Sequence, residues 1–236
     1  MSRFWKLVSL FFLLGFFIIL ISANAQAHKP IDTSGPATKV NPIVITEHRV
    51  SWAAYNEFLA PGEVHYYRLE GVKSGEKIHL SLLVPYLERL KDYFPVIALM
   101  GPGLEEDFSG LDPEKILELL KPGEGEGVIV KQFAGQEAGT FFEPFTQTRY
   151  LERQEMNIFA PASGNYYAAV VDLEGRADKY VFAIGEEEKW GPADILSMPR
   201  IWWDVRLFME KETSTYITAG IVASSAILIA VWLIKR

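Results

Sequence analysis

The sequence predicts a mainly β protein: a jelly-roll-like antiparallel β-sandwich with one short inserted helix, a juxtamembrane amphipathic helix and a single C-terminal transmembrane helix. Three observations lead to this fold class. Short β-branched and aromatic runs alternate with turn residues through the middle of the chain. One segment there carries both a helix start and a helix stop, and a long uncharged apolar run lies at the C-terminal end.

Eight short runs have strand character, and together they predict the sandwich. Residues 28–42, which contain three prolines, are interpreted as a linker. The runs then fill residues 43–185, the predicted extracytoplasmic domain. They lie at residues 43–52, 63–69, 77–84, 95–100, 128–133, 155–159, 166–171 and 179–184.

Two of these runs, residues 63–69 and 77–84, flank a glycine-containing turn and are expected to be adjacent strands. His65 and His79 would then be cross-strand neighbours, and two such histidines are able to bind a metal. We nevertheless expect no metal and no cofactor, because the sequence has no cysteine, no H-E-x-x-H motif and no evident third ligand.

The inserted helix is predicted over residues 112–121. Asp112 suits the N-cap and Pro113 the first helical position, and the Pro-Gly pair at residues 122–123 ends the helix. We expect the helix to cap one end of the sandwich through its apolar residues Ile116, Leu117, Leu119 and Leu120.

The turn motifs of the middle segment follow a recognisable order. Residues 62–67 read GEVHYY and residues 74–78 read SGEKI, followed by APASGNYY at 160–167 and YVFAIG at 180–185. This order resembles the bacterial pre-peptidase C-terminal domain family over residues 43–185, with an insertion between Gly101 and Glu152. The resemblance implies a secreted jelly-roll module that acts as a binding or accessory unit and carries no catalytic residues.

The N-terminal end is typical of a secretory signal peptide. Two basic residues, Arg3 and Lys6, precede an apolar run and then small residues that fit cleavage after Ala25 or after Ala27. An uncleaved signal anchor is the alternative, but the apolar run is shorter than the roughly 20 residues that a spanning helix needs. We therefore expect residues 1–27 to be a signal peptide.

The apolar run at residues 216–234 is predicted to be the transmembrane helix. At about 1.5 Å per residue it spans the roughly 30 Å hydrocarbon core. The basic tail at residues 235–236 is expected to stay cytoplasmic, so the preceding domain lies outside the cell membrane, in agreement with the signal peptide. Gly220 and Ser224, four residues apart, are the expected packing positions for self-association in the lipid bilayer.

Residues 186–215 form the predicted juxtamembrane helical segment, with Pro199 as an expected break. The segment would lie in the headgroup interface, and docking back onto the sandwich is the alternative. Aromatic and basic side chains favour that interface. The residues expected there are Trp202, Trp203, Arg206, Phe208, Tyr216 and Trp232.

The charge is concentrated in the middle of the chain. Of the 23 basic residues, four lie in the two apolar ends, so the middle carries 19 basic against 30 acidic residues, a net charge of −11. An acidic domain repels phosphate backbones. We therefore expect no nucleic-acid partner.

The segment at residues 141–150 holds four aromatic residues, one acid and one base. Aromatic faces flanked by polar groups suit sugar rings or peptides. The alternatives are that the aromatics fill the core beneath a long loop and that the acid and base form a structural ion pair. The candidate ligand-binding residues are Phe141, Phe142, Glu143, Phe145, Arg149 and Tyr150.

These features favour a membrane-anchored extracytoplasmic binding or accessory module that is not an enzyme and engages an envelope protein partner or a polysaccharide. The predicted soluble part has no G-x-S-x-G motif and no glycine-rich phosphate loop. Two alternatives stay open. One is a membrane-tethered hydrolase that uses carboxylates, and the other is a small accessory subunit of a transporter or secretion complex that acts through its helices.

Overall fold

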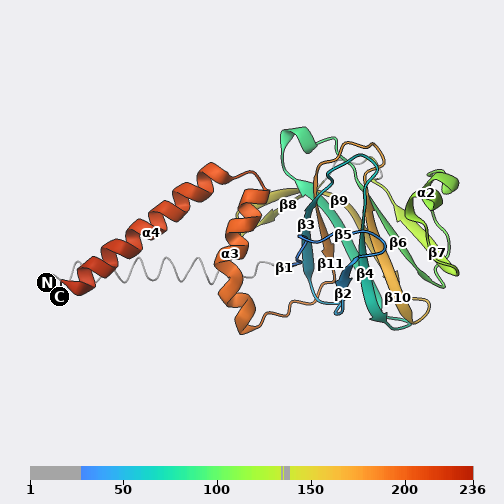
Figure 1. The fold of residues 1–236 in the computed structure, drawn as a ribbon, viewed down its shortest axis with the longest axis horizontal. Helices are drawn as coiled ribbons and strands as arrows, with labels where there is room; N and C mark the ends of the chain where they lie inside the picture. The colour runs from blue at the N-terminus through green and yellow to red at the C-terminus, as the bar shows by residue number, and fades with distance from the viewer. Residues whose placement is uncertain (1–27, 134, 136–138, 236) are drawn as a thin grey trace. The chain divides into compact units, whose positions relative to one another are not determined.

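The computed structural model describes residues 28–133, 135 and 139–235, so the predicted signal peptide lies outside the described residues. The chain divides into two compact units, one ending at Trp190 and one beginning at Gly191. The first unit is the mainly β domain that the sequence predicts (Figure 1).

Two sheets make up the β domain. The six-stranded sheet has the order β1 (Lys29–Pro30), β3 (Trp52–Glu57), β11 (Lys179–Ile184), β5 (Lys77–Pro85), β9 (Thr148–Phe159) and β8 (Thr140–Glu143). The five-stranded sheet has the order β2 (Ile43–Ile45), β4 (Val64–Val72), β10 (Gly164–Val171), β6 (Val96–Pro102) and β7 (Glu126–Lys131). Apart from the short parallel pairs β1–β3 and β2–β4, the pairs of these two sheets are antiparallel.

The main core lies between the two sheets. Alternate residues of each strand point into it, as the period of two requires. Tyr67 from β4, Leu80 and Leu82 from β5, and Phe182 from β11 are fully buried there. The fold class predicted from the alternation is therefore confirmed.

The predicted pairing of residues 63–69 with residues 77–84 is wrong. These residues lie in β4 and β5, which belong to opposite sheets, because the chain crosses between the sheets at the turn around Gly75. Both strands turn an apolar face to the core in either arrangement, so alternation alone does not distinguish adjacent strands from facing strands.

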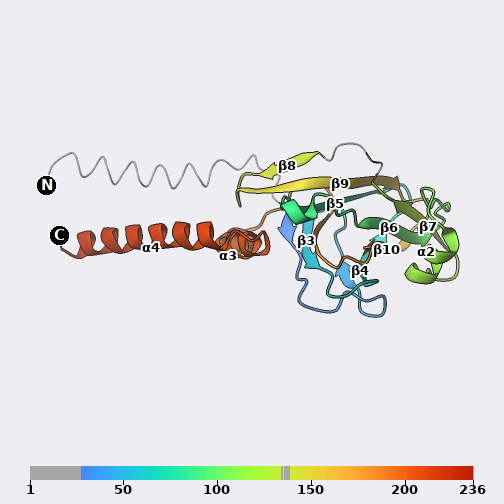
Figure 2. The same cartoon turned by 90° about the horizontal axis from the view of Figure 1, so that it is seen from above.

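The inserted helix α2 (Pro113–Leu120) begins where it was predicted. The Asp112 carboxylate accepts the backbone N–H of Glu114 at 3.1 Å and caps it. The expected position at the end of the sandwich is wrong. Ile116 and Leu120 instead pack on the outer face of the five-stranded sheet, beside β7 (Figure 2). The helix covers β6, which is apolar on both faces and would otherwise expose one of them.

Strands also occupy two regions that the sequence predicts as irregular. β1 lies in the predicted linker and pairs with β3. Residues 140–159 form the hairpin β8–β9, of which only residues 155–159 were predicted as a strand. Figure 2 shows β8 alongside β9 at the edge of the six-stranded sheet.

The turn motifs behind the family resemblance lie side by side. The backbone N–H of Ser74 donates to Ser163 Oγ at 2.9 Å, and that of Gly75 donates to Ala160 O at 2.8 Å. The buried Tyr166 then closes the second turn by donating its hydroxyl to Ala162 O at 2.8 Å. Motifs 85 residues apart in the sequence therefore fix one corner of the sandwich together.

The second unit contains α3 (Pro192–Phe208) and α4 (Glu212–Ile234). The break expected at Pro199 is wrong, because α3 continues through it; the proline removes one backbone N–H without ending the helix. Within α4, the segment Glu212–Trp232 is long and apolar enough to cross a membrane. The predicted C-terminal helix is therefore present.

Candidate functional site

The aromatic segment at residues 141–150 is not a long loop but the β8–β9 hairpin. Its register pairs Phe142 with Arg149 and Phe141 with Tyr150, so these two pairs lie on opposite faces. Tyr86, directly after β5, continues the sheet by donating its backbone N–H to Arg149 O at 2.9 Å. Phe142, Arg149 and Tyr86 thus form one row across three strands, which we call the aromatic row.

The aromatic row is exposed and carries a cation in its middle. Phe142 is 49% exposed and Tyr86 is 52% exposed. The Arg149 guanidinium lies over the Tyr86 ring, with its Cζ 5.5 Å from the ring centroid. Within the part of the chain that the structure describes, no acidic side chain pairs with Arg149. The row therefore presents an apolar surface together with an available positive charge.

The opposite face of the hairpin is packed. The rings of Phe141 and Tyr150 lie 6.0 Å apart, and Tyr150 is buried. Its hydroxyl accepts a hydrogen bond from Thr148 Oγ1 at 2.9 Å. These two aromatics pack against each other and support the hairpin.

Glu143 closes the turn of the hairpin. Its carboxylate accepts the backbone N–H of Phe145 at 2.8 Å and that of Thr146 at 2.6 Å, and it also accepts the Thr146 hydroxyl. Glu143 is buried, so these bonds replace its hydration. Of the six predicted ligand residues, the structure therefore brings Phe142 and Arg149 together at the surface and places Glu143 in the turn.

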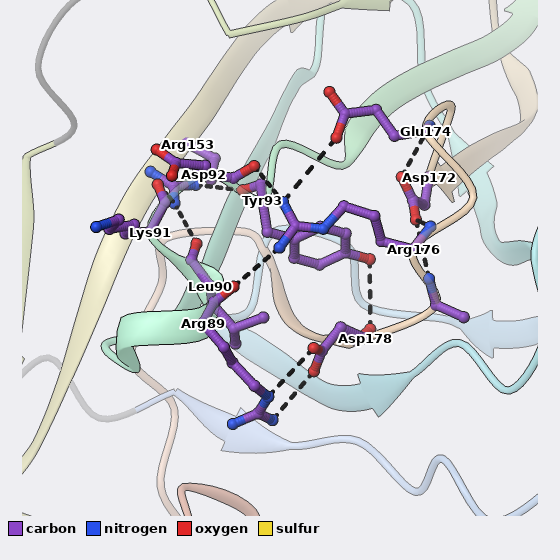
Figure 3. A network of polar contacts seen from close by, with 11 residues as sticks. Arg89, Leu90, Lys91, Asp92, Tyr93, Arg153, Asp172, Glu174, Arg176 and Asp178 are labelled. Carbon is purple, nitrogen blue, oxygen red and sulfur yellow. Dashed lines mark hydrogen bonds and ion pairs between the residues drawn. The ribbon is translucent and has the colours of Figure 1, made fainter.

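Arg153 holds the loop that follows Tyr86. It lies on β9 at a bulge, where the register with β5 shifts. Its Nε donates to Tyr93 O at 2.7 Å, and its Nη2 donates to Leu90 O and Lys91 O, each at 2.8 Å (Figure 3). The guanidinium lies 4.5 Å from the centroid of the Phe94 ring. Burial lowers the pKa of Arg153 to about 10, so it stays charged at neutral pH.

Arg176 holds the same loop from the other side. Its Nη2 donates to Arg89 O at 2.8 Å and its Nη1 to Asp92 O, and the guanidinium lies over the Tyr93 ring (Figure 3). The buried Asp172 carboxylate accepts the backbone N–H groups of Arg176 and of two neighbours, which fixes the turn that carries Arg176. The loop is therefore held in one conformation next to the aromatic row.

A chain of buried polar side chains crosses the core from β11 to β4. The Tyr180 hydroxyl lies 2.6 Å from His65 Nδ1 and 2.9 Å from the Tyr67 hydroxyl. His65 Nε2 lies 3.0 Å from Glu63 Oε1. Burial lowers the pKa of His65, and the Glu63 carboxylate partly opposes this. His65 is therefore a neutral structural group at pH 7.

His65 and His79 are not neighbours, which corrects the sequence-based expectation. His65 lies on β4 in one sheet and His79 on β5 in the other, where its Nδ1 contacts Asn157 Oδ1 at 2.9 Å. Among residues 28–133, 135 and 139–235, no three histidine, cysteine, aspartate or glutamate side chains converge on one point.

The corner between α3 and α4 contains several predicted membrane-interface residues. Arg206 Nε donates to Thr215 Oγ1 at 2.9 Å, and its guanidinium lies over the Trp202 ring at 4.7 Å. The rings of Trp203 and Tyr216 meet edge to face at 5.4 Å. These contacts join the last turn of α3 to the first turn of α4. The predicted packing positions, residues 220 and 224, are both exposed on α4.

No protein family model matches the chain, and no curated protein is significantly similar to it in sequence. Among solved structures it is similar to PliG of Aeromonas hydrophila, a periplasmic inhibitor of g-type lysozyme, at 12% identity over 67% of this chain and 95% of PliG (TM-score 0.33). It is also similar to MopE, a secreted protein of Methylococcus capsulatus described with copper binding, at 11% identity over 68% of this chain and 92% of MopE (TM-score 0.32). TM-scores this low establish neither a shared fold nor a shared function.

Proposed function

We propose that this protein is a single-span, extracytoplasmic binding module of the cell envelope that is not an enzyme, and that the aromatic row is its binding surface. The apolar α4 would anchor it in the bilayer with its basic C-terminus in the cytoplasm. The resemblance to pre-peptidase C-terminal domains belongs to this proposal, because those modules act as binding or accessory units.

The observation that carries the proposal is the exposed aromatic row on a rigid support. Tyrosine, tryptophan and arginine are the residue types that most often dominate binding energy at interfaces. Glu143 fixes the turn on one side of the row and Arg153 fixes the loop on the other. A surface held in place before binding loses little conformational entropy when a partner arrives.

The chemistry of the row favours a protein partner over a neutral polysaccharide. Arg149 is available to a carboxylate, and a hydrogen bond between a guanidinium and a carboxylate is stronger than one between neutral groups. β8 also ends the strand order of its sheet, so no described strand pairs with its outer edge. A free strand edge accepts an extended peptide through backbone hydrogen bonds. We therefore propose an envelope protein with an extended, acidic segment as the partner.

The test is affinity purification of the full chain from solubilised membranes of its own host, with mass spectrometry of co-purifying proteins. Phe142→Ala and Arg149→Ala should each weaken capture of the partner by roughly 30-fold, the effect of losing an interface residue worth about 2 kcal/mol. Phe159→Ala is the matched control, because Phe159 is exposed on the same strand but lies away from the row.

Recovery of the protein alone, or equal capture by all variants, would overturn the assignment of the row. Capture of a cell-wall polysaccharide that depends on Phe142 but not on Arg149 would support a sugar-binding row and refute the protein partner. The anchored topology has its own test: protease added to intact cells, or to cells with a permeabilised outer membrane, should digest the β domain.

A further inference from the structure

The edge strand β8 differs from the strands at the other three sheet edges. The two sheets end in β1, β8, β2 and β7. β1 contains Pro30 and β2 directly follows Pro42, and proline, which has no backbone N–H, hinders the addition of a strand. The edge of β7 is covered by Asp107, whose backbone N–H donates to Val128 O at 2.9 Å. β8, whose sequence is TFFE, has neither protection among the residues that the structure describes (Figure 2).

The hydrogen bonds of the hairpin show which backbone groups face the free edge of β8. Glu152 N–H donates to Gly139 O at 2.9 Å, so the backbone of Gly139 is directed toward β9. Successive residues of a strand direct their N–H and C=O groups to opposite sides, so Phe141 also bonds toward β9. The N–H and C=O groups of Thr140 and Phe142 point the other way, and no described strand pairs with them. The edge therefore offers two donors and two acceptors to an added strand.

An added strand would extend the aromatic row by one position. Phe142 and Arg149 form a non-hydrogen-bonded pair, whose Cα atoms lie about 4.5 Å apart in an antiparallel ladder. A residue added opposite Phe142 exchanges two backbone hydrogen bonds with it, at a Cα separation of about 5.5 Å. Its side chain lies on the face of the row, about 10 Å from Arg149 measured between Cα atoms. Extended arginine and acidic side chains together span that distance across the Phe142 ring.

Charge favours an acidic residue at this added position. The Arg149 guanidinium lies over the Tyr86 ring, and no acidic side chain of the described residues pairs with it. The opposite face of β8 is negative, because Glu152 is exposed there and its Oε2 would lie 2.0 Å from a Cβ at Gly139. An acidic side chain on that face would be repelled, whereas on the face of the row it meets a cation.

We propose that the partner of the aromatic row adds an extended segment antiparallel to β8, with an acidic residue directly opposite Phe142. This inference rests on the proposed function and specifies how the same surface recognises its partner. Antiparallel addition continues the pattern of this sheet, in which β1–β3 is the parallel exception, and antiparallel pairs are slightly more stable per residue. On binding, the Arg149 guanidinium turns from Tyr86 toward Phe142 and pairs with the acidic side chain.

Thr140→Pro tests the strand addition while the aromatic row stays intact. Proline at this position removes the outward N–H, and an edge strand tolerates proline where its N–H faces solvent. Capture of the partner from solubilised membranes should fall at least tenfold, while the urea midpoint of the β domain stays that of the wild type. Thr140→Ala keeps the N–H and should capture at least tenfold more partner than Thr140→Pro does.

The outcome for Thr140→Pro separates this inference from the proposed function. Loss of capture by Phe142→Ala and Arg149→Ala, with full capture by Thr140→Pro, would refute strand addition and leave the row as the binding surface. Equal capture by all of these variants would refute both.

Selection of short random peptides displayed on phage, with the full chain in detergent micelles as the target, tests the acidic position. The wild type should enrich peptides in which one acidic residue lies among β-branched and aromatic residues. Arg149→Glu should enrich peptides with a basic residue at the same position, because it reverses the charge of the row. Enrichment of the same peptides by both proteins would overturn the role given to Arg149.

Disulfide trapping tests the direction of the added strand. Thr140→Cys gives the chain a single thiol, because the sequence has no cysteine. In antiparallel addition, the peptide residue two positions after the acidic one lies opposite Thr140, with about 5.5 Å between the Cα atoms, which suits a disulfide. An enriched peptide with cysteine at that position should therefore be trapped at least tenfold faster than one with cysteine two positions before the acidic residue. The reverse preference would show parallel addition and overturn the proposed direction.

Discussion

Replacing Tyr180 with phenylalanine tests whether the buried polar chain stabilises the β domain. The Tyr180 hydroxyl contacts His65 Nδ1 at 2.6 Å and the Tyr67 hydroxyl at 2.9 Å. All three side chains are buried, and the two tyrosines are fully buried. The substitution keeps the ring and its packing against Phe58, so it removes hydrogen bonds without creating a large cavity.

The expected loss follows from the two groups left behind. Each buried polar group that loses its partner costs about 1–3 kcal/mol. His65 Nδ1 loses its partner, whereas the Tyr67 hydroxyl keeps a hydrogen bond to the Asn56 side chain, so we expect a loss of about 2 kcal/mol in the free energy of unfolding. For a domain of this size that corresponds to a fall of roughly 4–8 °C in Tm.

The measurement is thermal and urea unfolding of the solubilised full chain, followed by the near-ultraviolet circular dichroism of the β domain. Tyr86→Phe is the control, because Tyr86 is half exposed and its loss of a hydroxyl should change stability by less than about 0.5 kcal/mol. If Tyr180→Phe were as stable as Tyr86→Phe, the chain of hydrogen bonds would make no net contribution and the reasoning would fail.

Three further substitutions test other parts of the fold. Burial lowers the pKa of His65, so the stability that depends on its neutral form is complete above about pH 6.5 and is lost as the pH falls. His65→Gln should therefore flatten the decline of the urea midpoint between pH 7 and pH 5, and an unchanged slope would contradict this reasoning. Asp112→Ala should cost about 1 kcal/mol by removing the cap of α2, measured by urea unfolding, and no loss would argue against the cap. Gly127→Ala should cost about 2–3 kcal/mol, because the new Cβ would lie 1.8 Å from Leu104 O, whereas Gly35→Ala meets open space and should be neutral in the same assay.

The sequence predicts most strands of the fold because their alternation is a local property. Residues 77–82, for example, alternate polar and apolar side chains as a half-buried strand requires, and they form most of β5. Alternation does not predict which strand each one pairs with. β4 and β5 are consecutive yet lie in opposite sheets, and the alternating pattern is the same in both arrangements.

The candidate site is predicted in part, for a related reason. The density of aromatics at residues 141–150 locates the hairpin, but not which side of it each residue occupies. Phe142 and Arg149 are exposed, while Glu143 and Tyr150 are buried. Side-chain direction in a hairpin depends on register, and the register depends on the turn that Glu143 closes.

Arg153 shows why the support of the site is invisible in the sequence. In a regular strand it would be one more charged residue between Glu152 and Glu155. The bulge in β9 redirects it toward the carbonyl groups of Tyr93 and Leu90, which are about 60 residues away in the chain. The Nε and Nη2 groups of this buried guanidinium find their acceptors on that loop, whereas Nη1 has no hydrogen-bond partner among the described residues, so the loop and the bulge depend on each other. Changes in either one should therefore affect the presentation of Tyr86 even when the aromatic row itself is intact.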